Sequence, residues 1–184
     1  MRDGFALTAA GAYAEFSDVA AESLRVALAG LDGLLRDVDE AIGFVLAGFP
    51  ELDVHPDVPA GMRELQRAGI RLITMTNGSA PLSEGMLSRA GVLDLWERRM
   101  SVGEARRWKP AAEPYRYAAQ CGVSQDQIAL IAVHPWDIDG AQRAGLITGW
   151  INRKDRAYPQ CFLPPDVMGS DLPAVADALL ALGD

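Results

Sequence analysis

The segment from Ile128 to Arg153 constrains the fold more than any other part of the chain. It opens with an unbroken apolar run at 128–133, passes through a stretch of helical character that ends at Gly145, and reaches a second apolar run at Ile147–Ile151. Two short apolar runs joined by one helix are typical of a strand–helix–strand unit in a parallel sheet. The sequence therefore predicts an α/β fold organised around this unit.

The rest of the chain divides into a helical part and an alternating part. Residues 1–50 show only helical patterns, and a proline-containing connector follows them. From residue 56 onward, further helices are expected at 57–68, 80–90, 111–120 and 171–182, and further strands at 70–75, 99–102 and 166–168. Such alternation predicts a doubly wound parallel sheet, a Rossmann-type core. We expect a helical module at 1–55 and the α/β core at 56–184.

Composition narrows the classes of function. Hydrophobic residues make up 49% of the 184 residues and the net charge is −8, so the chain can form a sizeable core and is a poor candidate for nucleic-acid binding. No apolar run approaches the length of a membrane span, and no membrane association is predicted. Cys121 and Cys161 lack the spacing of a metal site, which favours a reduced, cytoplasmic setting.

Polar residues follow three of the predicted strands. Thr76 and Asn77 come after the strand at 70–75, Lys109 follows the weak strand at 99–102, and Asp137 follows the run at 128–133. Loops at the carboxyl ends of parallel strands converge at one edge of the sheet, where such folds bind ligands. The lysine could orient an anionic group, and the aspartate could balance the lysine or position a water molecule.

Each of these residues also has a purely structural interpretation. Asn77 with Gly78 is a common turn pair, a lysine before a proline is usually a solvated surface residue, and Asp137 could cap the helix that follows it. Structural roles are also the simpler interpretation of three nearby aromatic or imidazole side chains, namely Tyr115, His134 and Trp136. The joint spacing of the three loops is more specific than any single residue.

Three segments resemble motifs of the haloacid dehalogenase superfamily. IRLITMTNGS, WKPAAEPY and HPWDIDGAQRAGLITGWINR are similar to its second, third and fourth motifs, in that order. The similarity is greatest to the type II branch, the L-2-haloacid dehalogenases, and GAYAEF followed by a long helix resembles part of that branch's helical cap. The resemblance implies a capped Rossmann-like core and a hydrolase that acts on a small 2-haloacid or related carboxylate without a cofactor. Members of the family are often homodimers.

The resemblance also implies roles for individual residues. Lys109 matches the invariant lysine of the third motif and Asp137 the aspartate of the fourth. Thr76 matches a serine or threonine that holds the substrate or the nucleophile, and Asn77 matches the adjacent polar position. This gives four predicted catalytic residues. The predicted substrate-binding residues are Tyr115, Trp136, His134 and Ser79. Many members carry asparagine at the position of His134.

The residue four positions before the fourth-motif aspartate favours dehalogenation over phosphoryl transfer. Phosphatases of the superfamily carry a carboxylate four residues before this aspartate, and both carboxylates bind Mg²⁺. Val133 occupies that position here, and an apolar side chain cannot ligate a hard cation, so no metal is predicted. This favours dehalogenation, in which an aspartate attacks the carbon bearing the halogen, halide leaves and water hydrolyses the ester. A phosphatase-like hydrolase is the alternative.

The attacking aspartate has no counterpart in the motif pattern of this chain. The resemblance places it at the end of a first strand that precedes the cap, but no apolar strand ending in aspartate precedes Gly11. Asp3 lies between Arg2 and Gly4 with no strand before it. We therefore expect a truncated chain that lacks the first core strand and is inactive as given. A non-catalytic remnant or binding module is a further alternative.

The missing strand has a structural consequence. In the family's sheet it lies between the strands predicted here at Ile70–Met75 and Ile128–Val133, which would then have open apolar edges. These two strands are expected to pair directly, to pair with another chain, or to leave the protein poorly soluble.

Overall fold

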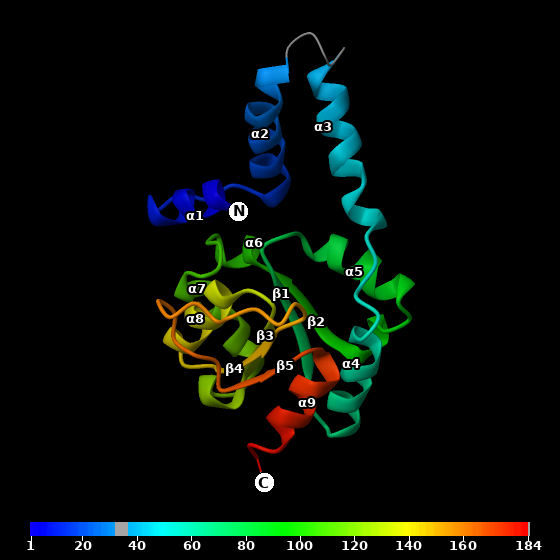
Figure 1. Ribbon diagram of the computed structural model, residues 1–184, viewed down its shortest axis with the longest axis vertical. Helices are drawn as coiled ribbons and strands as arrows, with labels where there is room; N and C mark the ends of the chain where they lie inside the picture. Colours follow the sequence, from blue (N-terminus) through cyan, green and yellow to red (C-terminus); the bar gives the residue numbers. More distant parts are fainter. Residues whose placement is uncertain (32–36, 184) are drawn as a thin grey trace.

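The computed structural model describes residues 1–31 and 37–183, and it shows an α/β body from which a pair of helices projects (Figure 1). The amino-terminal helices are α1 (Arg2–Ala9), α2 (Phe16–Leu28) and α3 (Val38–Ala47). The helices of the body are α4 (Val58–Arg67), α5 (Ala80–Arg89), α6 (Val102–Ala105), α7 (Ala112–Ala118), α8 (Pro135–Arg143) and α9 (Leu172–Leu180). Short 3-10 turns are η1 (Ala29–Leu31), η2 (Phe49–Glu51), η3 (Leu93–Leu95), η4 (Ala119–Cys121) and η5 (Gln125–Gln127).

The projecting pair consists of α2 and α3, which lie side by side and antiparallel (Figure 1). The Asp37 side chain caps α3 by accepting hydrogen bonds from the backbone N–H groups of Asp39 and Glu40, at 2.8 and 3.2 Å. Arg25 of α2 forms an ion pair with Asp39, at 2.7 Å. The helical prediction for 1–50 is confirmed except at 32–36, which lie outside the described residues. Among the described helices, none combines the length and apolar character needed to cross a bilayer.

The strands form two separate parallel sheets. One sheet pairs β1 (Leu72–Thr76) with β2 (Trp96–Ser101), and the other has the order β3 (Ala129–Ala132), β4 (Ile147–Ile151), β5 (Val167–Gly169). The predicted parallel α/β fold is confirmed. A continuous sheet, and direct pairing of the two open-edged strands, are not found in the described part of the chain. Residues of β1 and β3 instead line opposite parts of a cavity of about 680 Å³.

Helix packing, rather than strand pairing, joins the two sheets. The main core cluster brings Leu72 of β1 and Ile151 of β4 together with side chains from α4, α5 and α9. The buried members of this cluster are Met62, Leu65, Leu72, Leu87, Val92, Ile151, Leu172, Val175 and Ala176. Burial of this much apolar surface is the main stabilising contribution to the body.

The second strand of the first sheet ends earlier than the sequence suggested. A strand was expected at 99–102, but β2 covers Trp96–Ser101 and Val102 begins α6. Ser101 and Glu104 form a capping box, in which the Ser101 hydroxyl accepts from the N–H of Gly103 at 3.2 Å. The Glu104 carboxylate accepts from the N–H of Ser101 at 3.0 Å. These two bonds satisfy the free donors of a helix start, so the chain turns into α6 at this point.

Asp57 connects three segments of the body. It precedes α4, its Oδ1 accepts a hydrogen bond from Arg153 at 2.6 Å, and its Oδ2 accepts from the backbone N–H of Leu172, the first residue of α9, at 2.8 Å. Burial raises the pKa of the Asp57 carboxyl, but the hydrogen bonds from Arg153 and Leu172 together outweigh it. The pKa of Asp57 therefore lies below its ordinary value of 3.8.

The substitution Asp57→Asn is expected to lower the free energy of unfolding by about 1–3 kcal/mol near neutral pH, because hydrogen bonds to a charged group are the stronger kind. A folded-state pKa below the unfolded value gives stability that is present above about pH 4 and is lost as the pH falls through the folded-state pKa. Urea denaturation at pH values from about 7 down to about 2 should show that the difference in free energy of unfolding between Asp57→Asn and the wild type shrinks as the pH falls. Asp53→Asn, at an 81% exposed partner of Arg89, is the control and should have no effect. A difference that stays constant with pH would contradict this account.

Candidate active site

A buried ion pair lies near the carboxyl ends of β1 and β3. Lys109 Nζ donates a hydrogen bond to Asp137 Oδ2 at 2.6 Å, and the two side chains are 8% and 6% exposed. The Tyr115 hydroxyl donates to the other oxygen, Oδ1, at 2.6 Å. Of the two roles that the sequence left open for Asp137, balancing the lysine requires this contact. With both oxygens bonded, the carboxylate is held in one orientation and in turn fixes the position of the ammonium group.

Asp137 lies within the first turn of α8, whereas the sequence placed it in the loop that follows the apolar run at 128–133. Pro135 begins the helix, and the backbone carbonyl of His134 accepts from the N–H of Asp137 at 2.9 Å. A proline at this position is favoured because its ring presets the helical φ angle and its missing N–H is not needed there. A carboxylate in the first turn is also stabilised by the helix dipole. The side chain is therefore directed at Lys109 without capping its own helix.

Asn77 fixes the backbone that carries Lys109. The N–H of Lys109 donates to Asn77 Oδ1 at 2.9 Å, and Asn77 Nδ2 donates back to the Lys109 carbonyl at 3.3 Å. Asn77 is 8% exposed. Both polar ends of this amide are thus engaged by the chain itself. The contact joins the end of β1 to the lysine loop and positions the ammonium group.

Thr76 and Ser79 use their hydroxyl groups locally. Thr76 Oγ1 accepts from the N–H of Gly78 at 2.9 Å, which closes the turn after β1. Ser79 caps α5 by accepting from the N–H of Leu82 at 3.4 Å. Ser79 also lines a small cavity of about 170 Å³ beside Phe16 of α2. Among the described hydrogen bonds, neither hydroxyl reaches the ion pair.

Trp136 faces the amino-terminal helix α1, and His134 lies beside Trp136. The Trp136 ring packs edge-on against Phe5 of α1 at 5.0 Å between centroids, and the His134 ring lies 5.2 Å from the Trp136 ring. His134 is exposed and its side chain makes no cap bond to α8. These two residues therefore connect α8 to α1, whereas Lys109, Asp137 and Tyr115 form the buried centre. The partner Phe5 was not predicted, and helical periodicity was its only sequence signal.

Trp108, which precedes Lys109, was also missed as a site residue. It is 1% exposed, its backbone N–H donates to Thr8 Oγ1 at 3.0 Å, and its indole N–H donates to the Ala14 carbonyl at 3.0 Å. Its ring stacks with Phe16 of α2 at 6.1 Å. A backbone hydrogen bond of Trp108 thereby holds the lysine loop to α1, and the buried ring holds it to Ala14 and to α2.

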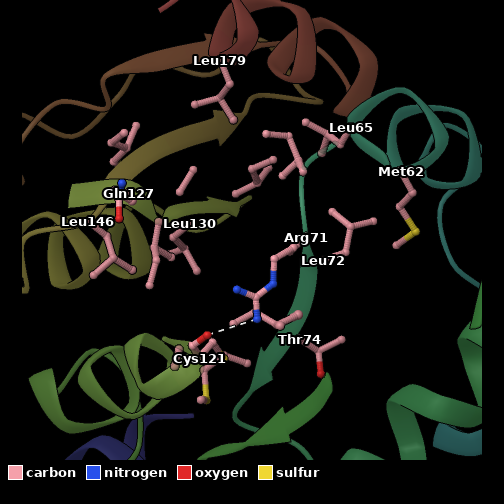
Figure 2. Close-up of a pocket in the computed structure, with 18 of the residues that line it drawn as sticks. Met62, Leu65, Arg71, Leu72, Thr74, Cys121, Gln127, Leu130, Leu146 and Leu179 are labelled. Carbon is pink, nitrogen blue, oxygen red and sulfur yellow. Dashed lines mark hydrogen bonds between the residues drawn. The ribbon is translucent and has the colours of Figure 1, made fainter. Parts of the chain in front are cut away.

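A largely apolar cavity of about 680 Å³ reaches the ion pair, and Lys109 and Tyr115 are among its lining residues. Figure 2 shows Leu72 and Thr74 of β1 on one side and Leu130 of β3 on another. A fixed ammonium group beside an apolar cavity is suited to bind a small molecule with one anionic end, because the low local dielectric strengthens the charge interaction.

Burial, followed by the charge of Asp137 and the hydrogen bond to it, raises the pKa of Tyr115 far above its ordinary value of 10.0. Each of these effects disfavours the phenolate form. Tyr115 therefore remains a hydrogen-bond donor to Asp137 across the physiological pH range. Its chemical role is to hold the carboxylate, not to accept a proton.

The region around Val133 shows no arrangement of oxygen ligands. Val133 follows β3, is 41% exposed, and its carbonyl accepts from the indole N–H of Trp150 at 3.2 Å. Within residues 1–31 and 37–183, no three or more His, Cys, Asp or Glu side chains gather closely enough to hold a metal ion. The centre of the candidate site is the pair formed by Lys109 and Asp137.

Gly140 allows the close packing that places Tyr115. A Cβ atom at Gly140 would lie 2.6 Å from Pro110 Cβ and 2.8 Å from the Tyr115 hydroxyl. Gly140→Ala is therefore expected to lower the free energy of unfolding by about 1–3 kcal/mol. The control is Gly43→Ala in α3, where no atom lies within 4 Å and about 0.5–1 kcal/mol of stabilisation is expected. Urea denaturation of both variants measures this, and equal stabilisation of the two would refute the packing argument.

Comparison with known sequences gives one family. The family described as haloacid dehalogenase-like hydrolase matches residues 7–145. Haloacetate dehalogenase H-2 of Moraxella sp. (strain B) is 29% identical over 158 residues, which cover 85% of this chain and 69% of that protein. The (S)-2-haloacid dehalogenase of Pseudomonas sp. (strain YL) is 30% identical over 167 residues, which cover 90% of this chain and 71% of that protein.

Solved structures give the same result for the fold. The L-2-haloacid dehalogenase from Xanthobacter autotrophicus with chloropropionic acid covalently bound matches with a TM-score of 0.87 at 18% identity, over 98% of this chain and 82% of that one. The L-2-haloacid dehalogenase RSc1362 matches with a TM-score of 0.83 at 28% identity, over 91% of this chain and 74% of that one.

Proposed function

Because the chain belongs to the haloacid dehalogenase-like hydrolases, we propose that its site is that of an enzyme removing halide from a small 2-haloalkanoic acid. The observation that carries the proposal is the Lys109 ammonium group, fixed by Asp137 at the edge of an apolar cavity. The ammonium group suits a substrate carboxylate or an attacking carboxylate, and the apolar walls suit the alkyl group and halogen. Relatives that are named 2-haloacid and haloacetate dehalogenases support this substrate class.

The proposed reaction has two steps. A carboxylate oxygen attacks the carbon that bears the halogen, and the carbon–halogen bond breaks with its electron pair leaving on the halide. Water then attacks the carbonyl carbon of the resulting ester and the acyl–oxygen bond breaks. The products of this second step are the 2-hydroxy acid, the regenerated carboxylate and one proton.

Asp137 does not fit the role of the attacking carboxylate. Its oxygens accept hydrogen bonds from Lys109 and Tyr115, and the residue is only 4% exposed. A nucleophile needs a free lone pair directed at the substrate, whereas these bonds hold both oxygens. We therefore infer that Asp137 positions the ammonium group, and that the attacking carboxylate is not among the described residues around Lys109. The 184-residue chain on its own is then expected to bind substrate without turnover.

The other predicted residues fall into three proposed groups. Tyr115 and Asn77 act as positioning residues, because each holds a member of the ion pair by direct hydrogen bonds. Thr76 shapes the turn between β1 and the lysine contact. The third group would contact the substrate from the side of the site near α1 and α2. Trp136 lies against α1, His134 lies beside Trp136, and Ser79 lies near Phe16 of α2.

The activity of the purified chain tests this proposal. With L-2-chloropropionate we expect no steady chloride release by ion chromatography, yet calorimetry should detect binding that Lys109→Met weakens at least about tenfold. Steady chloride release would show that a described residue can act as the nucleophile. Mg²⁺-dependent release of p-nitrophenol from p-nitrophenyl phosphate would favour the phosphatase-like alternative. Unchanged binding in Lys109→Met would show that the ion pair is not part of the substrate-binding site.

A further inference from the structure

We propose that Thr8 of α1 is a positioning residue for Lys109, and that it acts through the backbone N–H of Trp108. Its hydroxyl group fixes the lysine loop, residues 106–111 between α6 and α7, and thereby fixes the direction of the ammonium group. The inference rests on the proposed function, in which this ammonium group binds the substrate, and it adds a contribution from an amino-terminal helix.

Helix α1 contacts the residue that precedes each member of the ion pair. Thr8 Oγ1 accepts a hydrogen bond from the backbone N–H of Trp108 at 3.0 Å, and Trp108 directly precedes the lysine. Phe5 packs edge-on against Trp136, with 5.0 Å between the ring centroids, and Trp136 directly precedes the aspartate. Residues three apart in a helix share one face, so the side chains of Phe5 and Thr8 lie side by side. A single face of α1 therefore contacts both segments that carry the ion pair.

The backbone of the lysine loop depends on acceptors from other segments. The N–H of Lys109 donates to Asn77 Oδ1 at 2.9 Å, and the preceding N–H, that of Trp108, donates to Thr8. Trp108 and Lys109 are 1% and 7% exposed, so water is a poor substitute for either acceptor. Because a buried N–H without an acceptor costs free energy, the loop keeps this course only while both acceptors are in place. Asn77 supplies one acceptor from the end of β1, and Thr8 supplies the other from α1.

The loop begins with a strained residue, Arg106. Its φ angle is 49°, in the left-handed region that residues with a Cβ atom rarely adopt. Such a conformation persists only where the surrounding contacts impose it. Among the described hydrogen bonds of the loop's backbone N–H groups, the bond to Thr8 is the first after Arg106. Without this bond, Arg106 can relax toward an ordinary conformation, and the chain that leads to Lys109 moves with it.

Helix formation does not explain a threonine at position 8. A branched Cβ makes threonine a poorer helix former than alanine, and α1 has only 8 residues. A threonine hydroxyl inside a helix usually turns back to a carbonyl of the same helix. Here the hydroxyl oxygen accepts from a residue 100 positions further along the chain. The contact with Trp108 therefore gives this hydroxyl a function beyond α1.

Docking of α1 on the body does not depend on this hydroxyl alone. Gly4 lies so close to the Trp108 ring that a Cβ atom there would overlap it, and Phe5 packs against Trp136. Neither contact involves the Thr8 hydroxyl, so both remain when it is removed. Loss of the hydroxyl therefore acts mainly on the lysine loop and leaves α1 in place.

The chain contains two lysines, and their relative reactivity measures the position of the loop. Lys109 is 7% exposed, whereas Lys154 is exposed. Trace labelling with acetic anhydride, followed by mass spectrometry of peptides, gives the acetylation of Lys109 relative to that of Lys154 in the same molecule. In Thr8→Val, which keeps the side-chain shape and removes the acceptor, this ratio should rise at least about threefold. Thr8→Ser keeps the acceptor and should retain the wild-type ratio.

Two control variants separate positioning from general destabilisation. Thr148→Val makes the same change at a threonine that is 0% exposed and whose Oγ1 accepts from the N–H of Asp166 at 3.2 Å. Ser23→Ala removes a hydroxyl that donates to Asp3 of α1 at 3.0 Å, and it leaves the Trp108 contact in place. Both variants should show the wild-type labelling ratio. Circular dichroism establishes that every variant is folded.

Calorimetry with L-2-chloropropionate connects the loop to binding. Thr8→Val should weaken binding about threefold or more, and Thr8→Ser should bind as the wild type does. In the Lys109→Met background, Thr8→Val should have no further effect on binding, because a positioning residue acts only through the group that it positions. A purely structural contribution would persist in that background.

An unchanged labelling ratio in Thr8→Val would overturn the proposal, as would an equal rise in Thr148→Val or a raised ratio in Thr8→Ser. Weaker binding in Thr8→Val to the same extent with and without the Lys109 ammonium group would overturn it too. A wild-type chain that does not bind L-2-chloropropionate would instead overturn the proposed function, and the labelling ratio would still decide whether Thr8 positions Lys109.

Discussion

Replacing Lys109 with methionine is expected to lower the free energy of unfolding by about 3–5 kcal/mol, because breaking a buried ion pair leaves an uncompensated charge. Asp137 would keep only the hydroxyl of Tyr115 as a side-chain donor, in a position that is 4% exposed. Methionine retains the length and apolar character of the lysine stem, so the change isolates the loss of the ammonium group. Urea denaturation of the purified variant measures the effect.

A double-mutant cycle separates this loss from general disturbance of the lysine loop. Combining Lys109→Met with Asp137→Asn removes both charges, and the double variant should be more stable than Lys109→Met alone. Lys154→Met, at an exposed position, serves as the matched control and should change stability by less than about 0.5 kcal/mol. If the double variant loses as much free energy of unfolding as the two single variants lose together, the two charges are not coupled.

Trp108→Ala is expected to lower the free energy of unfolding by about 3–5 kcal/mol, the range typical of a fully buried large aromatic residue. The ring packs on Phe16 and contacts Gly4, where an added Cβ would lie within 2.6 Å of ring atoms. Its removal should also loosen α1 and α2 from the body, because the ring lies against Gly4 of α1 and Phe16 of α2 and its indole N–H bonds the Ala14 carbonyl.

Hydrogen exchange distinguishes local loosening from global unfolding. In Trp108→Ala, amides of α2 around Val19 should exchange faster than those of α9, whereas global destabilisation would accelerate both groups alike. Trp108→Phe is the matched control, because it keeps a buried ring and loses mainly the indole hydrogen bond to the Ala14 carbonyl. A loss of about 1–2 kcal/mol is expected for that variant. Equal losses for the two substitutions would contradict the packing role of the ring.

Local sequence patterns were sufficient to predict where the site residues that follow strands would lie. The apolar run at 128–133 and the helix after it placed Asp137 at a carboxyl-terminal strand end, and the same reasoning placed Asn77 near Lys109. Both contacts are present in the structure. This worked because parallel strands bring their carboxyl ends to one edge regardless of the loops between them.

Contacts between distant segments could not be predicted from local patterns. The bonds of Trp108 to Thr8 and Ala14 span 100 and 94 residues, and nothing in the sequence around Trp108 indicates these partners. Trp136 packs against Phe5 of α1 and His134 lies against Trp136, and only the tertiary structure reveals these contacts. The cavity between β1 and β3 is likewise lined by segments that are distant in the sequence.

Calorimetry of L-2-chloropropionate binding tests the central claim most directly, because that claim rests on the Lys109 ammonium group that Asp137 fixes at the edge of the apolar cavity. We expect the wild-type chain to bind the acid, Lys109→Met to bind it at least about tenfold more weakly, and Lys154→Met to bind it as the wild type does. Equal affinity of the wild-type chain and Lys109→Met would contradict the claim.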